Sequence, residues 1–197
     1  MKTTIKNTIG ILALSLFSLG VSAQSTTTTN SNSASTGIIW SAGVNGGLST
    51  GNFKDSHKWS LGGSLQADIP VAKQFYLTVN AGYDNFYGKS NYEGTGISAP
   101  DIHLLPAMAG IKFFPIPMLY LQADAGAGFL LNKDDLGYNK TAAFLYAPEI
   151  GLQFPIGGKS YIDAGVKYEG TTKFESGDTN SKINTLGLRI AYAFGTK

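Results

Sequence analysis

The segment LYLQADAGAGFLL, residues 119–131, alternates between two kinds of side chain. One set is apolar or small: Leu119, Leu121, Ala123, Ala125, Ala127 and Phe129. The other set is polar or small: Tyr120, Gln122, Asp124, Gly126 and Gly128. A period of two is typical of a β-strand whose two faces meet different surroundings. A buried parallel strand would be a continuous aliphatic run, and a helix would not carry two glycines so close together.

The same alternation recurs in seven other segments after Gly37: residues 39–49, 59–69, 75–83, 102–114, 144–154, 161–169 and 183–194. Short connections at 70–74, 115–118 and 155–160 separate long polar ones at 49–58, 84–101, 132–141 and 170–182. This rhythm predicts an all-β fold, a closed antiparallel up-and-down barrel of eight strands. Pro106 and Pro148 each remove a backbone donor from a predicted strand, so we expect local bulges there.

The composition excludes several classes of protein. Charged residues make up 14% of the 197 residues, against roughly 25% in ordinary soluble proteins. The chain has no cysteine, which excludes disulfides, thiolate metal sites, cysteine nucleophiles and a lipidated N-terminal cysteine. We expect no nucleic-acid partner, because the chain without its first 23 residues carries 13 basic and 13 acidic residues.

The N-terminus has the three parts of a secretory signal peptide. Lys2 and Lys6 precede the apolar run 9–20, and the small residues 21–23 supply a cleavage site near Ala23. We therefore predict a signal peptide at 1–23, a disordered Ser/Thr/Asn-rich tract at 24–36 and a barrel domain at 37–197. After Ala23 no apolar run approaches the ~20 residues of a spanning helix.

The alternation predicts that the apolar faces meet lipid and the polar faces line the barrel interior. A sheet crosses a bilayer only when it closes, because lipid cannot satisfy an open edge. Such barrels carry aromatic girdles at both membrane interfaces. Near the short turns we expect Trp40, Phe75, Phe113, Phe154, Tyr192 and Phe194. Near the long loops we expect Trp59, Tyr83, Phe129, Phe144, Tyr146 and Tyr168.

On these features, residues 37–194 resemble the eight-stranded outer-membrane β-barrel family of OmpX and the OmpA transmembrane domain. The last strand, LGLRIAYAF, is similar to the C-terminal insertion signal of that family, although GTK follows Phe194 here. The resemblance implies a bacterial outer-membrane location, with lipids as partners and insertion by the outer-membrane assembly machinery. It also implies that small barrels of this kind include some lipid-modifying enzymes.

Four charged residues on the predicted inner face fall at nearly the same height: Asp124, Glu149, Lys167 and Arg189. An eight-stranded barrel is just wide enough for side chains to fill it. We therefore expect a structural ion-pair cluster, in which Glu149 and Asp124 bridge the two cations. A gated ion path along the same residues is the alternative.

Few residues in the sequence are candidates for catalysis or metal binding. His57 follows Asp55 and Ser56, and His103 follows Asp101. A catalytic nucleophile needs a base within hydrogen-bonding reach that a third group orients, and adjacency in sequence does not establish this. The segment NKDDLGYN, 132–139, lacks the ligand spacing of a calcium loop. We expect no catalytic residue, cofactor or metal.

The sequence therefore predicts a non-enzymatic outer-membrane barrel with a side-chain-filled lumen, four exterior loops, and a structural or surface-interaction role. Two alternatives remain. A lipid-modifying enzyme would require His57 or His103 to meet a nucleophile and an acid. A soluble lipocalin-like barrel that binds a small apolar ligand would require an apolar interior.

Overall fold

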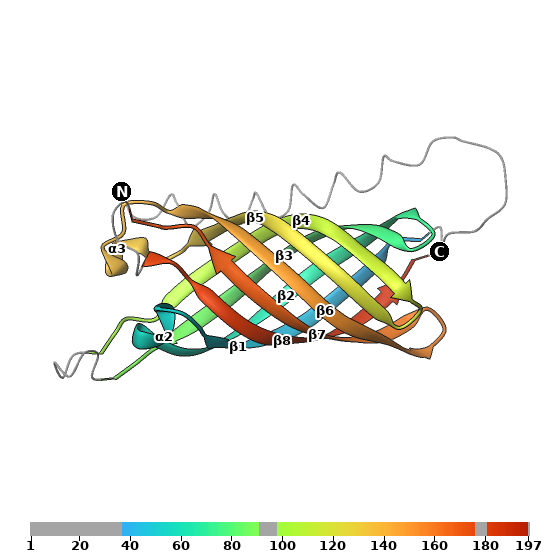
Figure 1. Cartoon of the computed structure of the whole chain (residues 1–197), viewed down its shortest axis with the longest axis horizontal. Coiled ribbons are helices and arrows are strands. Elements are labelled where there is room, and N and C mark those ends of the chain that lie inside the picture. The colour runs from blue at the N-terminus through green and yellow to red at the C-terminus, as the bar shows by residue number, and fades with distance from the viewer. Residues whose placement is uncertain (1–36, 91–97, 176–180, 197) are drawn as a thin grey trace, which may run out of the picture. The chain divides into compact units, whose positions relative to one another are not determined.

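The computed structural model describes residues 37–90, 98–175 and 181–196. Within them, the strands form one closed antiparallel barrel, in which each strand pairs with its sequence neighbours and β8 pairs with β1 (Figure 1). The strands are β1 (Ile39–Ser49), β2 (His57–Ala72), β3 (Phe75–Gly88), β4 (Ile102–Ile116), β5 (Leu119–Leu130), β6 (Ala142–Gly157), β7 (Ser160–Thr171) and β8 (Asn184–Gly195). The predicted barrel is confirmed. The predicted signal peptide and the 24–36 tract lie outside the described residues.

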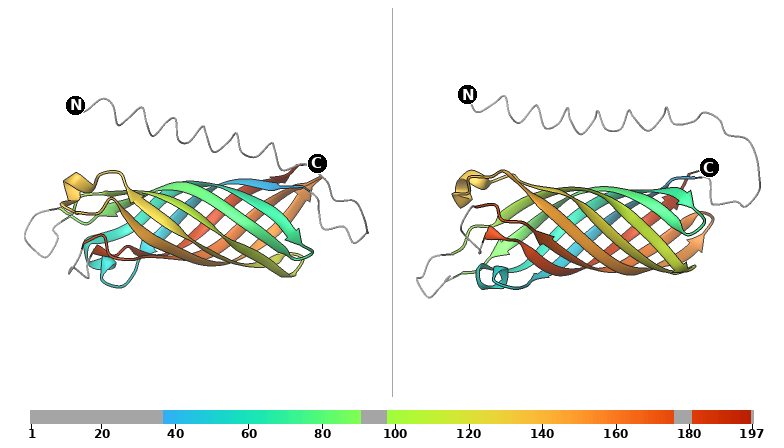
Figure 2. Two further views of the ribbon diagram at one scale, coloured as in Figure 1. Left: turned by 90° about the horizontal axis from the view of Figure 1, so that it is seen from above. Right: turned by 45° about the horizontal axis from the view of Figure 1, so that its top comes forward.

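The two ends of the barrel differ, as the loop rhythm predicts. Turns of two residues join the strands at one end, at 73–74, 117–118 and 158–159. Gly157 and Gly158 allow the last of these turns, because their φ angles of 125° and 58° are rarely adopted by other residues. The long loops lie at the other end and carry the short helices α2 (Phe53–Ser56) and α3 (Lys133–Leu136) (Figures 1 and 2). No helix among the described residues is long and apolar enough to span a membrane.

Burial follows the alternation of the sequence. In β6 every second residue from Ala143 to Gln153 is buried, and the residues between them are exposed. The exposed set consists largely of aliphatic and aromatic side chains, so the outer wall is apolar. Leu65 and Leu188, for example, are 57% and 60% exposed. A soluble lipocalin-like barrel would need the opposite arrangement, with its aliphatic faces turned inward.

The bulges expected at Pro106 and Pro148 do not form, so that prediction is wrong. Around Pro106 the β3–β4 ladder omits two pairs but resumes in the same register, from Ala81 opposite Ala107 to Asp84 opposite Leu104. The β6–β7 ladder passes Pro148 in the same way. Each proline lacks its donor toward one neighbour only, and the ladder on its other side is continuous. Register shifts occur instead near strand ends, as between Phe113 and Ile116.

Most of the aromatic residues predicted for the girdles lie in the outer thirds of their strands, although Tyr83 lies near the middle of β3. Nine of the twelve are at least 39% exposed. Trp40, Phe113 and Tyr168 are half-buried, and Phe113 stacks on Phe75 with 4.6 Å between ring centroids. Their position at the bilayer interfaces stays a prediction.

Candidate functional site

The barrel interior holds a network of charged and polar side chains centred on Lys112. Its Nζ lies 3.0 Å from Asp68 Oδ2 and 2.9 Å from Asp163 Oδ2, and all three side chains are at most 2% exposed. The ammonium also stands 4.1 Å from the centroid of the Tyr120 ring, a cation–π contact. These residues come from β4, β2, β7 and β5, so one lysine ties together strands on several sides of the barrel.

Tyr120 extends this network to a third carboxylate. Its hydroxyl oxygen lies 2.5 Å from both Glu149 Oε1 and Asp163 Oδ1. A phenol carries one proton, so it donates to one of these carboxylates at a time. The Tyr120 hydroxyl therefore connects Glu149 to Asp163, which is paired with Lys112.

Arg189 joins the same network from β8. Its Nη1 lies 3.8 Å from Asp163 Oδ1, a longer ion pair than those of Lys112. Its Nη2 donates to Ser41 Oγ at 2.8 Å and its Nε to Ser64 Oγ at 3.2 Å. Hydroxyl groups of β1 and β2 thus accept two of the hydrogen bonds of this guanidinium.

Asp124 is held by neutral donors. It accepts hydrogen bonds from Thr78 Oγ1 at 2.5 Å, Asn80 Nδ2 at 2.9 Å and Gln122 Nε2 at 2.6 Å. Lys167 pairs with Glu169, two residues along its own strand, at 2.8 Å. It lies directly opposite Glu149 in the β6–β7 ladder. The interior therefore has separate charged centres at different heights.

The four residues predicted as one cluster all face the interior, but their nearest partners differ from the prediction. The expected bridging by Asp124 and Glu149 needs correction, because the Arg189 ion pair is with Asp163 and the Lys167 ion pair is with Glu169. Counting along neighbouring strands places side chains by height. It does not show which long side chain reaches across the barrel.

Sequence reasoning missed Lys112, Asp68, Asp163 and Tyr120 as members of the network. Their signal was present, since each lies in a predicted segment on the face opposite its aliphatic residues. With them, the charged side chains buried in the interior are six carboxylates and three cations among the described residues. The carboxylates are Asp68, Asp84, Asp124, Glu149, Asp163 and Glu169, and the cations are Lys112, Lys167 and Arg189.

An apolar cluster lies at the loop end of the interior. It unites inward residues of the strand ends with loop residues: Phe53, Phe86, Ile102, Leu104, Leu130, Ala143, Phe174 and Ile183. Leu136 and Tyr138 pack against it from the β5–β6 connection. The loops therefore contribute apolar side chains to the barrel, which their polar composition does not indicate.

The two histidines have structural partners. His57 is 4% exposed and stacks on Phe53, with 4.5 Å between ring centroids. Its Nε2 donates to the Pro100 carbonyl at 3.1 Å, because a carbonyl can only accept, and its Nδ1 accepts from Ser56 Oγ at 2.9 Å. A backbone carbonyl orients this ring. His103 Nδ1 lies 2.7 Å from the Tyr83 hydroxyl, on the outer side of β4.

The contacts of residues 132–139 hold the loops together. Asn132 donates from Nδ2 to the Asp101 carbonyl at 2.7 Å and accepts from the His103 backbone N–H at 3.0 Å. Lys133 pairs with Asp134 at 3.3 Å on the surface. Among the described residues there is no group of three or more His, Cys, Asp or Glu that could hold a metal ion.

The model of the "Outer membrane protein beta-barrel domain" family matches residues 9–194. The chain belongs to this family. Membership of this outer-membrane barrel family explains the apolar outer wall, which faces lipid in the bacterial outer membrane. It also agrees with the resemblance that the strand pattern and the last strand suggest. No curated protein matches the chain by sequence.

Among solved structures, OprG from Pseudomonas aeruginosa is similar to this barrel at a TM-score of 0.53. It shares 11% identity, over 81% of this chain and 95% of the OprG chain, so the similarity concerns the fold alone. Ail from Yersinia pestis in a nanodisc gives a TM-score of 0.49 with 18% identity, over 80% of this chain and 99% of Ail. AlkL in lipid bilayers gives 0.47 with 13% identity, over 88% and 96%.

Proposed function

We propose that this outer-membrane barrel is a non-enzymatic membrane scaffold that presents its loops at the cell surface and conducts no ions through its lumen. The observation that carries the proposal is the filled interior. Lys112, with its two carboxylates, blocks the barrel at one level, and the apolar cluster occupies the loop end. Eight strands leave an interior just wide enough for such side chains.

Links between the loops support the role in surface interaction. His57, the first residue of β2, joins the loop end of this strand to the β3–β4 connection through the Pro100 carbonyl. Glu175 joins the β7–β8 connection to the β5–β6 connection, accepting from the Asn139 backbone at 3.0 Å and from its Nδ2 at 2.9 Å. A preorganised surface binds with less loss of conformational entropy than free loops.

The proposed partners in the envelope follow from the outer wall and the last strand. Outer-membrane lipids contact the exposed aliphatic side chains, and the assembly machinery inserts the chain after cleavage of the signal peptide near Ala23. The alternation from Leu186 to Phe194 on the exposed face of β8 supports insertion of this kind.

Single-channel recording in planar bilayers tests the proposal. The refolded wild-type protein should give no regular conductance steps, because the charged centre and the apolar cluster both obstruct the lumen. As a positive control, removal of Lys112 together with Phe86 and Phe174 should produce measurable openings if the variant folds. Regular steps from the wild-type protein would contradict the closed lumen.

A lipid assay distinguishes the enzymatic alternative, which the Ser56–His57 contact keeps open. The proposal expects no release of fatty acid from phospholipid vesicles that contain the refolded protein. Release that disappears in His57→Ala and persists in His103→Ala would favour a lipid-modifying enzyme and overturn the non-enzymatic proposal.

A further inference from the structure

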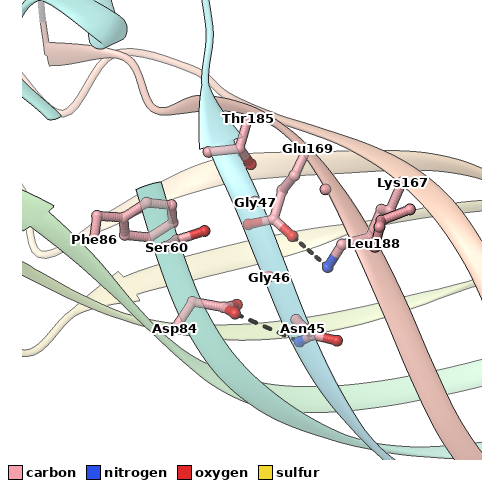
Figure 3. Close-up of a pocket in the computed structure, with 11 residues that line it drawn as sticks. Asn45, Gly46, Gly47, Ser60, Asp84, Phe86, Lys167, Glu169, Thr185 and Leu188 are labelled. Atoms are coloured by element: carbon pink, nitrogen blue, oxygen red, sulfur yellow. Dashed lines mark hydrogen bonds and ion pairs between the residues drawn. The ribbon is translucent and has the colours of Figure 1, made fainter. Parts of the chain in front are cut away.

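A small cavity inside the barrel is lined in part by polar side chains, among them the Lys167–Glu169 ion pair. Its volume is about 20 Å³. It is lined by residues of β1, β2, β3, β7 and β8, including Asn45, Ser60, Asp84, Glu169 and Thr185 (Figure 3). A cavity of this size holds one water-sized particle, since a water needs roughly 10–15 Å³ of such volume.

Asp84 is the residue that points to a ligand. It is 4% exposed, and no donor among the described residues bonds its Oδ2. Its Oδ1 has a long hydrogen bond of 3.4 Å from Asn45 Nδ2 (Figure 3). A buried carboxylate is normally paired or fully hydrogen-bonded, because water otherwise solvates its charge.

The charges around the cavity leave Asp84 uncompensated. Lys167 Nζ lies 2.8 Å from Glu169 Oε2, so this ion pair neutralises itself. The lining then carries one formal negative charge, on Asp84. The interior as a whole also has an excess of negative charge, since its described charged residues are six carboxylates and three cations.

We propose that this cavity binds one hard monovalent cation of the size of Na⁺, with the Asp84 carboxylate as its principal ligand. Ser60 and Thr185 offer neutral oxygen atoms from the surrounding strands. Oxygen ligands suit hard cations, and soft metals prefer the thiolate and imidazole groups that this lining lacks. One net negative charge and a nearby ammonium group favour a monovalent over a divalent ion.

Glycine at position 47 keeps the cavity open. A Cβ added to Gly47 would lie 2.9 Å from Ser60 Oγ, the end of a small side chain that can turn away. A Cβ at Gly187 would meet the Gly46 carbonyl oxygen at 2.7 Å, which is backbone and cannot turn away. Gly47→Ala is therefore a variant that reduces the cavity without changing its charge.

Thermal unfolding in detergent tests the proposal, with NaCl replaced by choline chloride at constant ionic strength. A ligand that binds only the folded state raises Tm as its concentration rises, so the wild-type Tm should increase with Na⁺ and not with choline. Asp84→Asn should abolish this Na⁺-dependent shift, and Gly47→Ala should reduce it.

Asp124→Asn is the matched control. Asp124 is also a buried inward carboxylate, but three donors already satisfy it. Whatever its baseline Tm, this variant should keep the Na⁺-dependent shift. The proposal fails if the wild-type Tm responds equally to choline, or if Asp84→Asn keeps the full shift.

A high-resolution crystal structure of the wild-type protein grown in NaCl decides the matter if Asp84→Asn does not fold. A cation should show several oxygen neighbours at distances clearly shorter than the ~2.8 Å of an O–H···O hydrogen bond. Density at hydrogen-bond distances would identify a water, and its presence in place of the ion would overturn the proposal.

Discussion

At the scale of single residues, the interior is dominated by charges that satisfy one another. Lys112 is fully buried, and its stability in that position depends on Asp68 and Asp163. Burying an ion is costly, so a buried pair persists when its geometry and its remaining hydrogen bonds are good. The hydroxyl of Tyr120 supplies one such bond, either to Asp163 or to Glu149.

A double-mutant cycle of Lys112→Met and Asp163→Asn should show strong coupling. Removing one partner of a buried ion pair costs about 3–5 kcal/mol, because it leaves an unpaired charge, and the second substitution should restore part of that loss. The measurement is the free energy of unfolding in urea from detergent micelles.

The comparison cycle is Arg189→Met with Glu149→Gln. Arg189 and Glu149 do not pair directly among the described residues, and Asp163 and Tyr120 lie between them. Their coupling energy should therefore be smaller than that of the first cycle. Equal coupling in both cycles would show that the interior acts as a single cluster, as the sequence predicted. If the two changes in unfolding free energy were strictly additive in the first cycle, water in the lumen would be screening the charges from one another.

At the scale of elements, the long β3–β4 connection is bound at its base. The Ala99 backbone N–H donates to the Lys89 carbonyl at 3.0 Å, and the Gly88 N–H donates to Asp101 Oδ1 at 2.9 Å. The strand itself continues to Gly88, and Phe86 near its end is 1% exposed in the apolar cluster. The 84–101 connection expected from the sequence therefore includes residues that belong to the barrel.

Replacement of residues 90–98 by a short turn should leave a folded barrel. Loop length affects closure entropy only weakly, and the backbone bonds at Gly88 and Lys89 remain available to hold the ends together. The measurement is gel mobility with and without boiling, since a folded barrel migrates differently before heating.

Shortening from residue 86 instead of residue 90 is the matched comparison. That deletion removes Phe86, and loss of a buried phenylalanine costs about 3–5 kcal/mol. The longer deletion should therefore lower the unfolding free energy far more than the shorter one. Similar stability of the two variants would show that the apolar cluster contributes little.

At the scale of the whole molecule, the barrel is apolar outside and charged inside, the reverse of a soluble protein. The outer wall meets lipid, so no exposed polar face is needed there. The closed strand order also leaves no unpaired edge among the described strands. These features together account for the low charge content of the chain.

Leu188→Arg should destabilise the barrel by about 2–4 kcal/mol, because Leu188 lies on the lipid face away from the strand ends. Leu131→Arg is the control: Leu131 is 48% exposed and directly follows the last residue of β5, where the cost should be about 0–1 kcal/mol. Unfolding of both variants from lipid vesicles measures the difference. Equal costs would contradict the placement of the membrane.

The sequence by itself determined the strands, their facing and the alternation of short turns with long loops. The physical reason is that both signals are local in the sequence. A period of two places successive residues on opposite faces of a strand, as with Leu121 outside and Gln122 inside, and turn-forming residues mark where a strand ends. It also indicated that Asp124, Glu149, Lys167 and Arg189 face the interior, although it did not give their partners.

Only the tertiary structure decided which interior groups meet. Lys112 on β4 pairs with Asp68 on β2 and Asp163 on β7, and neither strand is its neighbour in the barrel. The Pro100 carbonyl meets His57 from a connection 43 residues away. Such contacts depend on the barrel's curvature and on the reach of each long side chain across it. Alternation along a strand carries neither quantity, because it records only the face on which a residue lies.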